Sequence, residues 1–181
     1  MEPPFQPNET PPPASRSSRE TLQLFLTDSL QELYFANDAI GNAFYSIQHL
    51  IGSSELKLVL NRHYNIHLNH KIRLEKIFQL QNIPVEPKDC AAVIALLGQA
   101  TEYLALFTQD IRHWEIALIL TSRKLAHYKI AAYGAAAHLA LSLQHAPSAT
   151  LLAVSVQEEE EYIERYLNGL THAFLSPLKG V

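Results

Sequence analysis

The distribution of prolines limits the possible folds of this chain more than any other feature of its sequence. Six of the ten prolines fall within residues 2–18, and the others stand at positions 84, 87, 147 and 177. Because proline interrupts the interior of a helix, the long stretches between these positions are free to be helical. Nothing in them resembles a series of short strands and hairpin turns. The sequence therefore predicts an all-α protein.

Apolar residues recur at helical spacing in the first of these stretches, in steps of three, four and seven: Leu22, Leu26, Leu30, Leu33, Ile40, Phe44, Ile47 and Ile51. This row predicts one amphipathic helix over residues 20–51. The Gly-Ser-Ser turn at 52–54 then leads into a second helix that ends near Gln81. So short a turn makes the two helices antiparallel neighbours.

Three capping residues predict where the remaining helices begin. Asp89 is placed to cap a short helix over residues 90–106, Asp110 a long helix to about residue 143, and Ser148 a last helix that ends before Pro177. Four helices of about thirty residues are each roughly 45 Å long. We expect a ferritin-like, antiparallel four-helix bundle over residues 19–176, with a short extra helix between the second and third long helices. Residues 1–18 are expected to be a disordered proline-rich leader and 177–181 a short tail.

Charge and cysteine content exclude several classes of protein. The net charge is −4 and the basic residues are scattered, which argues against nucleic acid and anionic membranes as partners. Cys90 is the only cysteine, so no intrachain disulfide or paired-thiol zinc motif is possible. The first residues are acidic and proline-rich, unlike a signal peptide, and no apolar stretch is long enough to span a bilayer. We expect a cytoplasmic protein.

Polar residues interrupt the apolar face near the middle of each long helix, and these interruptions are the functional signal. The residues are Asn37 in the first helix, His63, His67 and His70 in the second, Arg123 in the fourth, and Glu159 in the last. Because the middles of helices of similar length lie at one level, these side chains should meet. Bundles build metal sites at that level.

Each of these residues also has a purely structural interpretation. Core histidines are more often hydrogen-bonded packing residues than ligands, and no carboxylate near them on the same helix completes a ligand set. The acidic run 158–161 is mainly a solvated helix face, from which Glu159 is favoured over Glu158 to point inward. Asn37 is equally compatible with a buried, hydrogen-bonded amide.

Three strings resemble the YciE/YciF family of ferritin-like bacterial proteins: ELYFAN at 32–37, RLEKIF at 73–78 and HYKIAAYG at 127–134. The similarity extends from Leu22 to Leu170. It implies a ferritin-like bundle, usually paired as a homodimer, with a two-metal carboxylate centre and an association with stress responses.

The chain departs from that family where the resemblance places metal ligands. Asn37 replaces a glutamate, Arg123 a glutamine, and Ala126 and Lys129 replace two further glutamates of the family string Q-x-x-EHYEIA. In the second helix, residues 65–67 (Asn-Ile-His) replace a carboxylate and a threonine, and His70 replaces a glutamine. The acidic pair Glu158 and Glu159 is retained.

The balance of charge at the centre of the bundle then indicates whether metal ions can bind there. Two divalent ions require several negative ligands in a low-dielectric interior, and one or two carboxylates cannot supply them. We therefore predict that no metal or other cofactor is bound. In this interpretation Arg123, with Lys129 as a second cation, pairs with Glu159 and hydrogen-bonds Asn37, and the protein has a structural or interaction role rather than an enzymatic one.

Two alternatives remain open from the sequence. In the first, the histidine row and Glu159 hold a single transition-metal ion, with His127 as an additional ligand, in an iron-handling or redox protein. In the second, the nine histidines make the bundle a pH-responsive module.

Overall fold

The structure is a computed structural model that describes residues 17–176. Its helices are α1 (Ser18–Ile47), α2 (Ser54–Gln81), α3 (Ala91–Leu106), α4 (Ile111–Ser142), α5 (Ala146–Tyr162) and α6 (Asn168–Leu175). A 3₁₀ turn, η1 (Gln48–Leu50), extends α1, and a π-helical turn, η2 (Ile163–Leu167), joins α5 to α6 into one rod. Since none of residues 17–176 forms a strand, the all-α prediction is confirmed.

The helix starts agree in part with the predicted caps. Asp110 caps α4 by accepting from the backbone N–H groups of Arg112 and His113, as predicted. Ser53 caps α2 in the same way. The predicted leader lies outside the described residues except at its end, where Ser17 and Glu20 form a capping box and α1 begins at Ser18. The predicted tail, 177–181, also lies outside them.

Two predicted caps are wrong. Asp89 does not cap α3, whose N-cap residue is Cys90 without a side-chain hydrogen bond. Ser148 lies inside α5, which begins at Ala146 with His145 as its N-cap residue, three residues earlier than a cap at Ser148 would place it. Proline is tolerated in the first turn of a helix, so Pro147 does not delay its start. The Ser148 hydroxyl instead accepts from Nε2 of Gln81 at 2.8 Å.

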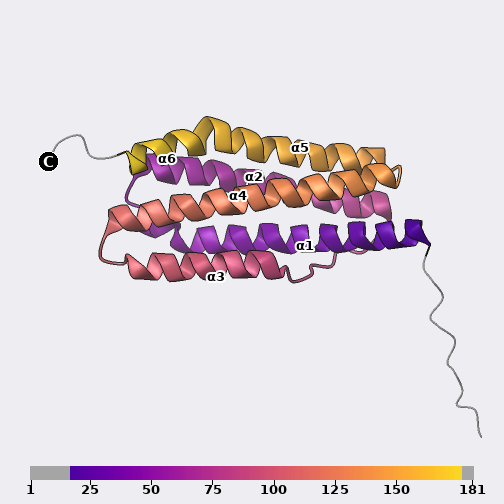
Figure 1. Cartoon of the computed structure of the whole chain (residues 1–181), viewed down its shortest axis with the longest axis horizontal. Coiled ribbons are helices and arrows are strands. Elements are labelled where there is room, and N and C mark those ends of the chain that lie inside the picture. Colours follow the sequence, from indigo (N-terminus) through magenta and orange to yellow (C-terminus); the bar gives the residue numbers. More distant parts are fainter. Residues whose placement is uncertain (1–16, 177–181) are drawn as a thin grey trace, which may run out of the picture.

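Each long helix packs against two antiparallel neighbours (Figure 1). Contacts between Asn37 and Tyr133 join α1 to α4, and the contact between Gln81 and Ser148 joins α2 to α5. Diagonally opposite helices α2 and α4 run parallel, so the chain must return along the bundle between them. Helix α3 makes this return beside α1 and α4 (Figure 1). The predicted four-helix bundle with an extra helix is confirmed.

A small apolar cluster packs α3 against α1 and α4, and two larger ones fill the ends of the interior with a polar layer between them. One cluster, around Leu30, Ile77 and Leu152, fills the end where α1 begins. The other, around Leu60 and Leu118, fills the opposite end. This arrangement holds the polar side chains at mid-bundle, away from water. Among residues 17–176, no helix has the length and apolarity that a membrane crossing requires.

Candidate functional site

The polar layer brings together most of the residues that the sequence placed on the inward faces. Six of its side chains are at most 5% exposed: Asn37, His63, His67, His70, Lys129 and Glu159. Glu158 and Arg73 join them from the edge of the layer. The inward orientation of the histidine row, Asn37 and Glu159 was predicted correctly, and the burial of Lys129 makes it the main cation of the layer.

The ammonium group of Lys129 lies at the centre of this layer. Its Nζ is 2.6 Å from Oε1 of Glu159 and 2.6 Å from Nδ1 of His67, and the side chain is fully buried. Burial lowers the pKa of Lys129, whereas the adjacent Glu159 carboxylate acts to raise it. An ammonium needs such a carboxylate, because an unpaired buried charge is very costly.

Glu159 is the anion that balances Lys129. Its Oε2 accepts a hydrogen bond from Nε2 of His63 at 2.7 Å. Burial alone would raise the pKa of the Glu159 carboxyl, but His63 and Lys129 outweigh it and hold this pKa well below its usual range. Glu159 is therefore ionised: its Oε2 accepts the hydrogen bond of His63, and its Oε1 forms the ion pair with Lys129.

His67 is neutral in this arrangement. Burial, reinforced by the positive charge of Lys129, holds the pKa of His67 well below its usual value. Its Nδ1 accepts the hydrogen bond of Lys129, so the ring proton belongs on Nε2. The tautomer of His67 thus follows from its contact with Lys129.

A second ion pair borders the first. The guanidinium of Arg73 donates to both oxygens of Glu158, at 2.6 and 2.5 Å, and Nε2 of His70 lies 3.1 Å from Oε2 of Glu158. Burial opposes ionisation of Glu158, but the contacts with His70 and Arg73 lower its pKa to about 2. Burial, aided by Lys129, lowers the pKa of His70 to about 4. Nδ1 of His70 is 3.6 Å from Oε1 of Glu159, which connects the two pairs.

Asn37 and two tyrosines complete the layer. Nδ2 of Asn37 donates to the hydroxyl of Tyr133 at 2.7 Å and to the carbonyl oxygen of Leu33 at 2.8 Å. The ring of Tyr162 stacks on His63, with 3.9 Å between centroids. Within residues 17–176, Oδ1 of Asn37 and the hydroxyl of Tyr162 are buried without a hydrogen-bond partner. Asn37 is thus a hydrogen-bonded core amide.

Three residues predicted for the centre do not contribute polar groups to it. Arg123 is partly exposed and donates to Oδ1 of Asn168 at 2.8 Å, so the predicted pairing of Arg123 with Glu159 is wrong. His127 is exposed on the outer side of α4. Ala126 is buried in an apolar cluster. The buried side of α4 includes Ile119, Ala126 and Tyr133, which share the predicted row with Arg123, but its inward polar residues are Ser122 and Lys129.

Sequence reasoning also missed residues that the layer uses. Arg73 was noticed only within the family string, yet it follows His70 by three positions and therefore shares its helix face. Tyr133, which accepts from Asn37, and Tyr162, which stacks on His63, also belong to the layer. The position of Arg73 was a usable signal, whereas the partners of the two tyrosines depend on tertiary packing.

The donor set does not fit a two-metal centre. The layer holds two carboxylates, and both already contact a cation, Glu159 with Lys129 and Glu158 with Arg73. A smaller set is closer to a metal site: ligand atoms of His63, His67 and Glu159 all lie within 4.8 Å of one another. Two imidazoles and a carboxylate are donors that zinc accepts. The ammonium of Lys129, however, contacts Glu159 and His67 from within this set.

We predict that the free energy of unfolding decreases as the pH is lowered from neutrality to pH 4. The folded-state pKa of His70 is below that of the unfolded chain, so the stabilisation is present above about pH 6.5 and is lost as the unfolded state takes up protons. From pH 7 to pH 4 the free energy of unfolding should decrease by about 3 kcal/mol through His70 alone. Urea unfolding at several pH values measures this decrease.

The His70→Gln variant keeps a hydrogen-bonding side chain but cannot titrate, so its stability should depend less on pH. His138, exposed on α4, provides the matched control as His138→Gln, which should behave as the wild type. Equal pH dependence in His70→Gln and the wild type would show that His70 is not buried as a neutral ring.

Comparisons with known proteins agree with this architecture. Residues 21–174 match the family model described as a domain of unknown function, DUF892. Protein YciF of Escherichia coli K12 is 24% identical over 142 residues, which cover 78% of this chain and 85% of YciF.

Two solved structures share the fold. The E. coli stress protein YciF superposes with a TM-score of 0.79 at 23% identity, covering 86% of this chain and 98% of that one. YcfI of Rhodopseudomonas palustris gives 0.78 at 22% identity, covering 83% and 95%. The resemblance seen in the sequence is confirmed: the chain belongs to the DUF892 family, that of YciE and YciF.

Proposed function

We propose that this protein is a metal-free member of its family, a ferritin-like bundle with a structural or interaction role and no enzymatic one. The observation that carries the proposal is the position of Lys129, whose Nζ lies 2.6 Å from both Glu159 and His67. An ammonium in that place takes over the charge of a metal ion, the role that the sequence had assigned first to Arg123.

The charges of the layer support this proposal. Its two carboxylates, Glu158 and Glu159, are matched by two cations, Arg73 and Lys129. A divalent ion added to this balanced set would bring uncompensated positive charge into a buried site, which is unfavourable. The layer therefore satisfies its own charges and needs no cofactor.

The family supplies the wider setting of the proposal. YciF is a stress protein, and a structural role has been suggested for YcfI. By analogy we propose a cytoplasmic homodimer that acts in a stress response through its surface rather than through chemistry in its core. The apolar side chains of Leu58, Leu68 and Ile72, 44–64% exposed on α2, are compatible with pairing of two copies.

A second candidate is a metal-binding protein with a single transition-metal ion for iron handling or redox chemistry. The closeness of His63, His67 and Glu159 supports it. In that case the ion would have to displace Lys129 from its contacts with Glu159 and His67. The second candidate therefore predicts a protein whose stability depends on the metal.

Removal of metal distinguishes the two candidates. The untagged protein should melt within about 2 °C of the same temperature after dialysis against EDTA and after addition of zinc, manganese or ferrous iron, because no binding energy is lost or gained. Thermal unfolding followed by circular dichroism is the measurement. A melting temperature that falls by about 10 °C with EDTA and recovers with one of these metals would favour the second candidate.

A further inference from the structure

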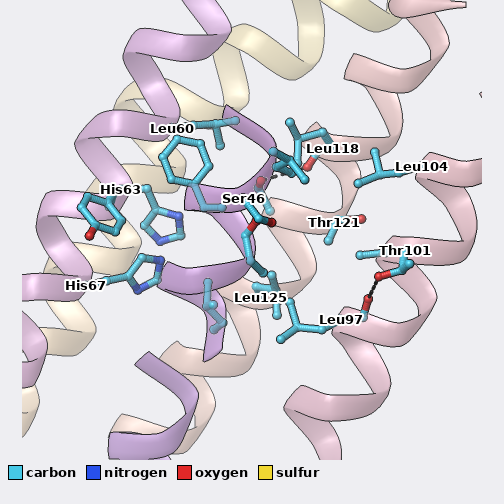
Figure 2. Close-up of a pocket in the computed structure, with 17 residues that line it drawn as sticks. Ser46, Leu60, His63, His67, Leu97, Thr101, Leu104, Leu118, Thr121 and Leu125 are labelled. Atoms are coloured by element: carbon cyan, nitrogen blue, oxygen red, sulfur yellow. Dashed lines mark hydrogen bonds between the residues drawn. The ribbon is translucent and has the colours of Figure 1, made fainter. Parts of the chain in front are cut away.

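A cavity of about 140 Å³ lies beside the polar layer and is lined by residues of α1, α2, α3 and α4 (Figure 2). Voids larger than a water molecule are few in protein interiors. A cavity of about 150 Å³ is large enough to bind benzene. The walls are mainly apolar, with Leu60, Leu97, Leu118 and Leu125 among them. The cavity therefore has the size and the lining of a site for a small organic molecule.

One wall of the cavity is polar. Figure 2 shows His63 and His67 together on one side and Leu97, Thr101 and Leu104 of α3 on the other. The polar layer uses one nitrogen of each histidine, Nε2 of His63 and Nδ1 of His67. For the other two nitrogens, the described part of the chain provides no hydrogen-bond partner. These two nitrogens are available to a ligand.

Two hydroxyl groups that line the cavity already donate hydrogen bonds within the protein. Thr101 donates to the carbonyl oxygen of Leu97 at 3.0 Å, and Ser122 donates to that of Leu118 at 2.9 Å. Both protons are therefore used within their own helices. The histidine wall and the hydroxyl of Thr121 are the groups that remain for hydrogen bonds to a ligand.

The ligand should be neutral and flat. No aspartate, glutamate, lysine or arginine lines the cavity, and Nδ1 of His67 accepts the hydrogen bond of Lys129, so the ring carries a single proton and no charge. A charged ligand would lose its hydration without gaining a counter-ion. The rings of Phe44 and Tyr64, with centroids 6.0 Å apart, add aromatic surface to the wall. Aromatic rings pack favourably on such surface.

We propose that this cavity binds a neutral molecule of one aromatic ring with a hydroxyl group, of the phenol class, with the hydroxyl directed at His63 and His67. A hydroxyl is both donor and acceptor, so it can donate to Nδ1 of His63 and accept from the Nε2 proton of His67. The apolar ring then fills the space up to α3. The proposal rests on the proposed function, because the contact of Lys129 with Nδ1 of His67 is what leaves the Nε2 proton for a ligand.

Titration calorimetry of the full chain with phenol, toluene and benzoate tests the chemistry. Phenol should bind one molecule per chain with a Kd on the order of 0.1–1 mM. Toluene, which lacks the hydroxyl, should bind about tenfold more weakly, because the histidine wall is then left unpaired. Benzoate should not bind. Absence of phenol binding, or benzoate binding as tight as that of phenol, would overturn the proposal.

Two variants locate the site. Ala100 is buried on α3 and lines the cavity, so Ala100→Phe should fill it and abolish phenol binding. Ala135→Phe introduces the same ring at an exposed position of α4 and should leave the Kd unchanged. Because Ala100→Phe places strain on the core, a crystal of the wild type soaked in 4-bromophenol supplies independent evidence. The anomalous signal of bromine should lie inside the cavity, and bromine elsewhere would overturn the assignment.

Discussion

Replacing Lys129 by methionine is expected to destabilise the protein by about 3–5 kcal/mol. The variant leaves the carboxylate of Glu159 fully buried without its cation, and the hydrogen bond from His63 is too little to replace it. Urea unfolding at pH 7, followed by circular dichroism, measures the loss. Lys124→Met provides the matched control: the same substitution on the same helix, at an exposed residue, should change stability by less than about 0.5 kcal/mol.

The double variant Lys129→Met with Glu159→Leu shows whether the cost comes from the unpaired charge. Replacing both partners of a buried ion pair by apolar residues is often close to neutral, so most of the lost stability should return. A single variant that loses less than about 1 kcal/mol would show that Glu159 does not depend on Lys129. A double variant no more stable than the single one would attribute the cost to packing instead.

Restoring the glutamates at positions 37, 126 and 129 is expected to create metal binding. In the triple variant Asn37→Glu, Ala126→Glu, Lys129→Glu, three carboxylates join Glu158 and Glu159 in the layer, and the central ammonium is gone. Because five carboxylates can neutralise two divalent ions, manganese or iron content should rise to between one and two equivalents per chain. Without metal the variant should be less stable than the wild type, owing to repulsion among the carboxylates.

A triple variant with the same charge change at exposed positions is the control. Asn42→Glu, Lys124→Glu and Ala131→Glu alter the same residue types on α1 and α4 outside the core. This control should bind no more metal than the wild type does. If both triple variants contained equal amounts of metal, the gain would reflect net charge, and the polar layer would not be the degenerate remnant of a metal centre.

Prediction from the sequence succeeded where a helix has one clear apolar stripe. In α1 and α2 large apolar residues mark a single face, so the inward orientation of Asn37 and of the histidine row followed directly. In α5 the same reasoning selected Glu159 rather than Glu158, and the structure agrees. Glu158 nevertheless reaches the edge of the layer, where it contacts Arg73.

Prediction failed on α4 because small and apolar residues occur on every side of that helix. Alanine occurs on its buried side, at Ala126 and Ala136, and on its exposed side, at Ala131 and Ala135. With this composition the apolar residues do not define which side of α4 faces the core. The sequence therefore pointed to Arg123 as the inward cation, whereas Lys129 is the one that is buried. A fully buried lysine is rare, and its partner Glu159 is distant in sequence.

The last helix shows a second limit of periodicity. At helical spacing the row of inward residues would pass from Tyr162 to Tyr166. The π-helical turn η2 accommodates an extra residue, so Leu167 is buried instead and Tyr166 is partly exposed. No local sequence pattern distinguishes a π-helical turn from an α-helical one. The stacking of Tyr162 on His63 immediately before η2 became visible only with the structure.

Metal content tests the central claim, that Lys129 takes the place of a metal ion, most directly. The full chain without a histidine tag should be purified after growth in medium supplemented with iron, manganese and zinc, and then examined by elemental mass spectrometry. We predict far less than one equivalent of each metal per chain, because the carboxylates of the layer are already paired with Lys129 and Arg73. One equivalent of zinc or iron that is lost in His63→Ala would contradict this account, and two equivalents of iron would contradict it entirely.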